Sequence, residues 1–196
     1  MFDYLKNILT LSGGTLVSQL ILILSIPILT RIYSPSDLGI TAFFLAIANI
    51  LSSLSTGKYE LAIFLPKNKF WIHNLFFATI LINFCFFVMS LIFIIPIQYF
   101  LNNYFMIDYS LVWFFSIPLI FFFNGLNFSF NAFLNKNKKY NYISIGRILR
   151  NIILAISSIS LGIYFLNPIF LIFSHILSLF VTNLFLFFIL HRLKIL

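Results

Sequence analysis

Side chains that could do chemistry are sparse in this chain of 196 residues, and they are too widely spread to make an active site. The four acidic residues occupy positions 3, 37, 60 and 108, so no two carboxylates are placed together for acid–base catalysis or for holding a metal. Cys85 is the only cysteine, which excludes an intrachain disulfide and a two-cysteine metal motif. His175 is one of three scattered histidines, and we interpret it as a packed or cavity-facing residue. We therefore expect no catalytic residue, no metal site and no cofactor.

A second group of residues, next to long apolar runs, is suited to binding. Ionisable residues at membrane depth are costly and mark functional sites, and a guanidinium can bind a phosphate through two hydrogen bonds. For Lys58 and Arg150 the alternative interpretation is interfacial anchoring by cations that snorkel to water. Glu60 has an equally simple alternative role, as the ion-pair partner of Lys58 or of a neighbouring arginine. The candidate ligand-binding residues are Arg31, Lys58, Glu60, Arg147, Asn49 and Asn151.

Small and polar residues recur at helical spacing in four segments. A spacing of 4-3-4-3-4 places Ala42, Ala46, Asn49, Ser53, Thr56 and Glu60 on one stripe of a helix. Similar stripes carry Thr15, Ser18, Gln19 and Ser25, then Asn124, Asn127, Asn131 and Asn135, then Ser144, Asn151, Ala155, Ser158 and Gly162. In lipid, such stripes mark faces that helices bury against each other. They can also line a wetted central cavity, and both interpretations stay open.

The elements that must position these residues are membrane-spanning helices. Hydrophobic residues make up 62% of the chain and charged residues only 8%, and a span needs about 20 largely apolar residues. A proline after asparagine, Asn167-Pro168, divides the last apolar run into a helical hairpin. The predicted spans are 9–30, 38–57, 74–97, 109–134, 144–166 and 169–190.

This pattern predicts an all-α polytopic membrane protein, a six-transmembrane-helix bundle that forms a single domain over residues 1–196. A soluble globule, a disordered chain and a secreted disulfide framework are excluded by the composition. A nucleic-acid-binding domain is excluded as well, because the net charge of +8 is divided among short segments between apolar runs.

The distribution of the cations predicts the orientation. With the N-terminus in the cytoplasm, eleven of the 12 Lys and Arg residues fall on the cytoplasmic side, and Arg31 alone lies outside. We therefore expect six crossings with both termini in the cytoplasm. The first apolar run is too long for a signal-peptide core, so we interpret it as an uncleaved signal anchor.

Several short motifs in the first third of the chain resemble a known family. They are Ser12-Gly13-Gly14, the segment 27–35 (PILTRIYSP), Asp37-Leu38-Gly39 and the segment 58–66 (KYELAIFLP). The run from Leu134 to Tyr140, with Arg147 after it, adds a more diffuse similarity. Together these residues resemble the N-terminal part of bacterial Wzx-type polysaccharide flippases, which belong to the multidrug, oligosaccharidyl-lipid and polysaccharide exporter superfamily.

The resemblance implies translocation of an undecaprenyl-diphosphate-linked oligosaccharide across the bacterial inner membrane, for O-antigen or capsule biosynthesis. Its partners would then be the lipid-linked oligosaccharide and the membrane lipids. By position, Arg31 and Lys58 look like the cavity cations of the family, with Glu60 and Arg147 as further candidates. Lysine at position 58 lacks the bidentate geometry that an arginine there would offer.

The chain has the length of one lobe, whereas members of the superfamily have 12 or 14 spans in two lobes. Three interpretations follow from the resemblance: a truncated flippase, one half of a split gene whose partner supplies the second lobe, or a protomer that rebuilds the cavity with a homodimer mate. The first two are preferred, because a homodimer would have to replace a different C-terminal lobe with a second N-terminal one.

Three other functions compete with the flippase. An inert fragment or interaction module would lack transport activity. A small-molecule or cation antiporter normally needs a carboxylate buried in a span, and Glu60 and Asp37 lie at span ends. An enzyme of glycan assembly would need converging acidic residues, which the sequence lacks.

Overall fold

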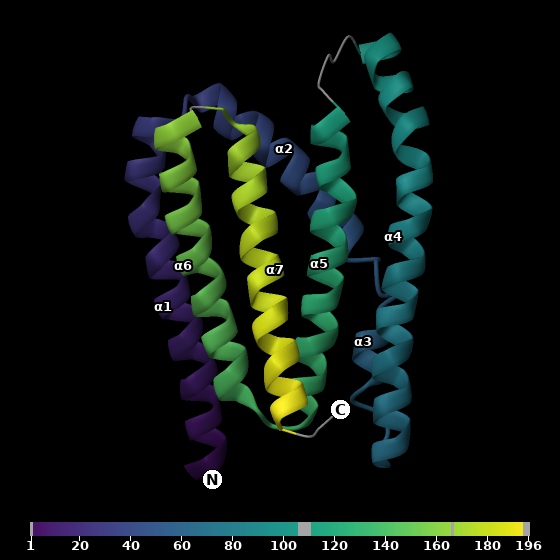
Figure 1. Ribbon diagram of the computed structural model, residues 1–196. Coiled ribbons are helices and arrows are strands. Elements are labelled where there is room, and N and C mark those ends of the chain that lie inside the picture. The colour runs from purple at the N-terminus through teal and green to yellow at the C-terminus, as the bar shows by residue number, and fades with distance from the viewer. Residues whose placement is uncertain (1, 106–110, 166, 194–196) are drawn as a thin grey trace.

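The computed structural model describes residues 2–105, 111–165 and 167–193. Within them the regular elements are helices, arranged side by side (Figure 1). The helices are α1 (Phe2–Ile32), α2 (Pro35–Ser52), α3 (Tyr59–Ala62), α4 (Lys69–Phe105), α5 (Leu111–Lys136), α6 (Tyr140–Phe165) and α7 (Ile169–Arg192). Six of these described helices, all except α3, are long and apolar enough to cross a membrane. The expected all-α bundle with six spans is confirmed.

Several helix boundaries differ from the predicted spans, most of all the ends of α2 and α4. α2 ends at Ser52, before the predicted limit of 57, because the chain turns there. α4 runs from Lys69 to Phe105 and so includes much of the connection predicted over 98–108. Pro96 lies inside α4 and does not end it. The predicted span ends at residues 109 and 166 lie outside the described residues.

A capping box fixes the start of α2. The hydroxyl of Ser34 accepts a hydrogen bond from the amide of Asp37 at 3.2 Å, and the carboxylate of Asp37 accepts one from the amide of Ser34 at 3.1 Å. Pro35 occupies the first helical position, where its missing N–H costs nothing. The chain therefore reverses tightly between α1 and α2.

α1 packs on α6 through small residues. A methyl group added to Gly14 would collide with Ser144, and one added to Gly162 would lie 2.7 Å from the hydroxyl of Tyr33. The hydroxyl of Ser144 donates to the carbonyl of Thr10 at 2.9 Å. The stripe predicted between residues 144 and 162 is thus largely a packing face, as expected for helices that associate in lipid.

α5 and α7 lie at the centre of the bundle. α7 packs on α5 and α6, while α5 packs on α4 and on the oblique α2 (Figure 1). One apolar cluster includes Phe76, Phe133 and Leu190, and a second includes Phe44 and Trp113. α1 begins and α7 ends at the same end of the bundle, the geometry that an even number of crossings requires.

Candidate functional site

A polar cavity lies among α3, α5, α6 and α7. Its volume is about 350 Å³. It brings together two arginines, one glutamate, amide groups and a hydroxyl, whereas a second hollow among the described helices is almost wholly apolar. The lining residues are Glu60, Asn127, Phe128, Asn131, Gly146, Arg147, Arg150, Thr182 and Leu186.

Arg147 and Arg150 reach the cavity from one face of α6, because residues three apart on a helix are neighbours on its surface. Arg147 is exposed, and its guanidinium donates a hydrogen bond of 2.7 Å to the hydroxyl of Thr15 on α1. That hydroxyl in turn donates to the carbonyl of Leu11 at 2.8 Å. α1 therefore holds one side of the Arg147 side chain and leaves its other donors available.

Arg150 is half-buried and lies deeper along α6. Its guanidinium donates to the side-chain oxygen of Asn124 on α5 at 3.5 Å, the upper limit for a hydrogen bond. The amide of Asn124 donates to the side-chain oxygen of Asn49 on α2 at 3.3 Å. These contacts connect α6, α5 and α2 through polar side chains.

A further chain of amides joins α5 to α7 and includes two residues that line the cavity, Asn127 and Asn131. Asn131 donates to the oxygen of Asn127 at 2.7 Å, and Asn127 donates to that of Asn183 at 3.3 Å. Asn183 closes the chain by donating to the carbonyl of Phe123 at 2.8 Å. Because these amides satisfy each other, the positions of Asn127 and Asn131 are fixed before any ligand arrives.

Glu60 reaches the cavity through a turn and not along α2. The backbone adopts the left-handed conformation at Gly57 and Lys58, with φ of 58° and 61°. α3 starts immediately after this turn, and the carboxylate of Glu60 accepts a short hydrogen bond from the hydroxyl of Thr56. The prediction of one continuous stripe from Ala42 to Glu60 is therefore wrong: the chain turns after Ser52.

The part of that stripe that lies on α2, from Ala42 to Asn49, is also not a packing face. Ala42, Ala46 and Asn49 are exposed, whereas α2 buries Phe44 and Ala48 against the bundle. Aromatic packing decides this orientation, since the ring of Phe44 lies 5.0 Å from that of Trp113 and 5.7 Å from that of Phe114.

The cavity has an excess of positive charge. Within the described part of the chain, neither Arg147 nor Arg150 forms an ion pair with Glu60 or with another carboxylate. Two guanidinium groups facing a single carboxylate leave a net charge of about +1 in the cavity at neutral pH. Such a site attracts an anion with several oxygen acceptors, and a phosphate group fits the donor geometry of arginine.

The six residues predicted as a binding set are only partly brought together. Glu60 and Arg147 line the cavity, and Asn49 contacts it through Asn124 and Arg150. Asn151 lies in the interface with α1, where its amide donates to the carbonyl of Ser18 at 2.8 Å.

The other two cations lie apart from the cavity. Lys58 is exposed in the turn before α3. Arg31 is exposed in the last turn of α1. At 1.5 Å per residue, Arg31 stands about 24 Å along α1 from Thr15, the contact of Arg147. One diphosphate cannot bridge that distance, so Arg31 and Arg147 do not form one site in this conformation.

The prediction missed Arg150 and Thr182 as lining residues. For Arg150 the sequence left both anchoring and binding open, because this residue stands near a span end. Its spacing of three from Arg147 was the signal that both cations share one face. His175 is half-buried, and its Nδ1 atom has no hydrogen-bond partner among the described residues. No group of three or more His, Cys, Asp or Glu within the described ranges could hold a metal ion.

Comparison of the chain with protein-family models, with curated proteins and with solved structures finds no match.

Proposed function

We propose that this chain is one lobe of a bacterial inner-membrane flippase that translocates an undecaprenyl-diphosphate-linked oligosaccharide for surface polysaccharide biosynthesis. The observation that carries the proposal is the cationic cavity formed by Arg147, Arg150 and Glu60 in a bundle of apolar spans. The choice of substrate in this proposal comes from the resemblance of the segments 27–35 and 58–66 to Wzx-type flippases.

The cavity residues match the chemistry of such a substrate. A diphosphate and a sugar chain cannot cross about 30 Å of hydrocarbon unaided, because unpaired polar groups are costly there. In the proposed function Arg147 and Arg150 bind the diphosphate oxygens. Asn127 and Asn131 offer amide groups to the sugar, and the hydroxyl oxygen of Thr182, whose hydrogen is donated to the carbonyl of Ser178 at 2.7 Å, offers an acceptor. The lipid tail stays in the bilayer.

Glu60 keeps the affinity moderate in this scheme. A carrier must release its substrate, and a carboxylate in the same cavity repels the diphosphate that the arginines attract. Arg31 lies in the last turn of α1, away from the cavity. In this scheme it binds the diphosphate at a different stage of the crossing.

Binding measured on the full-length chain tests the proposal. The chain is placed in nanodiscs and titrated with fluorescent undecaprenyl diphosphate that carries a short oligosaccharide. We expect saturable binding, and about tenfold weaker binding for Arg147→Gln and for Arg150→Gln, since each loses a charge-assisted hydrogen bond. The matched control is Lys67→Gln, which removes an exposed cation outside the cavity and should bind like the wild type.

Two results would contradict the proposal. One is equal binding of undecaprenyl diphosphate and undecaprenol, which lacks the phosphates. The other is equal binding by the wild type and both arginine variants. Movement of the labelled substrate across liposomes containing the chain, with and without a second lobe supplied in trans, separates an active carrier from an inert fragment.

A further inference from the structure

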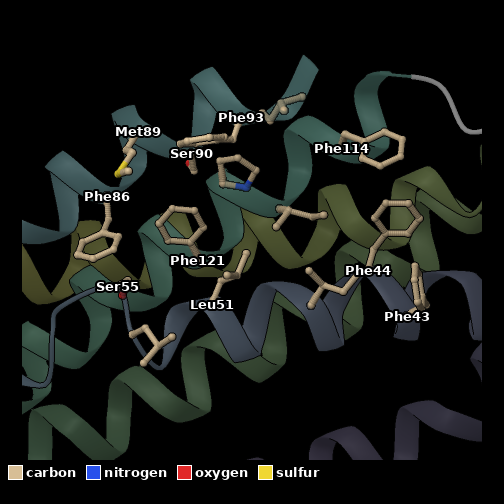
Figure 2. Close-up of a pocket in the computed structure, with 15 residues that line it drawn as sticks. Phe43, Phe44, Leu51, Ser55, Phe86, Met89, Ser90, Phe93, Phe114 and Phe121 are labelled. Atoms are coloured by element: carbon tan, nitrogen blue, oxygen red, sulfur yellow. The ribbon is translucent and has the colours of Figure 1, made fainter. Parts of the chain in front are cut away.

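A second hollow lies between α2, α4 and α5, apart from the polar cavity (Figure 2). Its volume is about 340 Å³. Phe44 and Leu51 line it from α2, Phe86 and Phe93 from α4, and Phe121 from α5. Ser55 and Ser90 are the only residues in its lining with polar side chains. We call this hollow the lateral groove.

Neither serine has a hydroxyl donor left for a water molecule in the lateral groove. The hydroxyl of Ser55 donates to the carbonyl of Ser52 at 2.8 Å, and that of Ser90 donates to the carbonyl of Phe87 at 2.6 Å. Both donors are therefore used within the backbone of their own segments. A water molecule needs two to four polar partners to be stable in a cavity, so the occupant of the lateral groove must be apolar.

The lateral groove opens toward the bilayer. The α4 residues on its rim, Phe86, Met89 and Phe93, are 46%, 55% and 49% exposed, and they lie within the candidate span Lys69–Pro96. The rim is thus continuous with the apolar surface that the bundle presents to lipid. α2 and α4 each pack on α5 and not extensively on each other, so protein does not fill the space between them.

We propose that the lateral groove holds one acyl chain of a membrane phospholipid, inserted between α2 and α4. The groove is apolar, it lies at the depth of the spans, and its mouth meets the hydrocarbon, where acyl chains are the solvent. An empty hollow would forfeit the dispersion contacts of its aromatic lining. The acyl chain fills the space that protein side chains would fill in a closely packed bundle, and it keeps α2 and α4 apart.

Photo-labelling by a phospholipid tests this site. The full-length chain is reconstituted in nanodiscs of phosphatidylethanolamine and phosphatidylglycerol, with a trace of phosphatidylethanolamine that carries a diazirine in the middle of one acyl chain. Adducts are located by mass spectrometry. The reference residues are Leu20 and Ile23 on α1, which are 56% and 57% exposed. We expect labelling of the groove residues Phe86, Met89 and Phe93 to exceed the labelling of these two residues several-fold.

Filling the lateral groove should remove the excess labelling. Ser90→Trp places a large ring inside it, and we expect the labelling at Met89 to fall to the level of α1. The matched control is Val88→Trp, which adds the same ring at a residue of α4 that is 43% exposed and does not line the groove. Its labelling pattern should equal that of the wild type.

Three results would overturn the assignment. Uniform labelling of all lipid-facing residues in the wild type would show ordinary annular lipid, whatever the variants do. Loss of the phospholipid adducts on adding undecaprenyl diphosphate would assign the lateral groove to a polyprenyl tail. Cross-links between two copies of the chain at Met89 would assign it to a protein partner. None of these depends on oligosaccharide binding at the polar cavity, so this inference and the proposed function can fail separately.

Discussion

Asn49 on α2 accepts a hydrogen bond of 3.3 Å from Asn124 on α5. The same Asn124 uses its oxygen to accept from Arg150 on α6 at 3.5 Å. One buried asparagine therefore orients both an oblique helix and a cavity cation. A change at Asn49 should therefore reach Arg150 through this amide.

The strength of this link can be measured by a double-mutant cycle with Asn49→Ala and Asn124→Ala. We expect a coupling free energy of about 0.6 kcal/mol, the typical value for hydrogen bonds between spans. Unfolding of the purified chain in mixed micelles, monitored by circular dichroism, supplies the four free energies. Additive effects of the two substitutions would show that the amide contact contributes nothing.

Inorganic pyrophosphate isolates the electrostatics of the polar cavity from the lipid tail. We expect Arg150→Gln to weaken its binding about tenfold, and Glu60→Gln to strengthen it, because the variant removes the one carboxylate facing the anion. Isothermal titration at two ionic strengths measures both effects. Tighter binding by Glu60→Gln should persist at higher salt, since a partly buried charge is screened less than an exposed one. Unchanged affinity in both variants would place the anion elsewhere.

Two neighbouring glycines should respond in opposite ways to alanine. Gly14 faces Ser144, so Gly14→Ala must push α1 and α6 apart at a cost of about 1–3 kcal/mol. Nothing lies within 4 Å of a methyl group at Gly13, and Gly13→Ala should be neutral or stabilise the helix by up to about 1 kcal/mol. Thermal unfolding in detergent distinguishes the two variants. Equal losses would mean that α1 does not pack on α6 through this face.

The orientation of the bundle can be tested with single cysteines. In a Cys85→Ser background, Lys67→Cys places a thiol just before the span Lys69–Pro96. Ser36→Cys places one in the first turn of the span Pro35–Ser52, at the opposite end of the bundle, and both positions are exposed. In intact cells with a permeable outer membrane, an impermeant maleimide should label position 36 and leave position 67 unlabelled. Labelling of 67 and protection of 36 would invert the predicted topology.

Tyr33, between α1 and α2, should contribute a pH-dependent part of the stability. Its hydroxyl donates to the carbonyl of Ser158 at 3.2 Å. Burial, and secondarily the negative charge of Asp37, raise the pKa of Tyr33 above its ordinary value of 10.0. The stabilisation is therefore complete below pH 10 and is lost as the pH rises through the pKa of the folded state. Stability curves for the wild type and Tyr33→Phe, measured up to high pH, should converge there; a constant difference would contradict this.

The fold was predictable because span length and charge distribution depend only on local composition. The polar cavity was predictable in part, since Glu60 and Arg147 were recognised from their place beside apolar runs. Arg150 was missed because a cation near a span end looks the same in sequence whether it anchors the helix or faces inward. Its contact with Asn124 depends on how α5 and α6 rotate against each other, which tertiary packing alone decides.

The connection between Asn49 and Glu60 shows a second limit. The regular spacing of small residues continued past the end of α2, although the backbone turns at Gly57 and Lys58. Periodicity cannot reveal such a turn when the residues on both sides keep the helical pattern. The separation of Arg31 from the cavity, about 24 Å along α1, was by contrast implied by the charge distribution, which puts Arg31 and the other cations at opposite ends of the spans.

The pairing of α1 with α6 has a consequence for how the protein is made. Ser144 and Thr10, which touch across this interface, are separated by 134 positions in the chain. The first helix thus leaves the ribosome and enters the bilayer long before its partner is synthesised. Until then its glycines and serines face lipid or the insertion machinery, and the interface between α1 and α6 forms only after α6 has entered the bilayer.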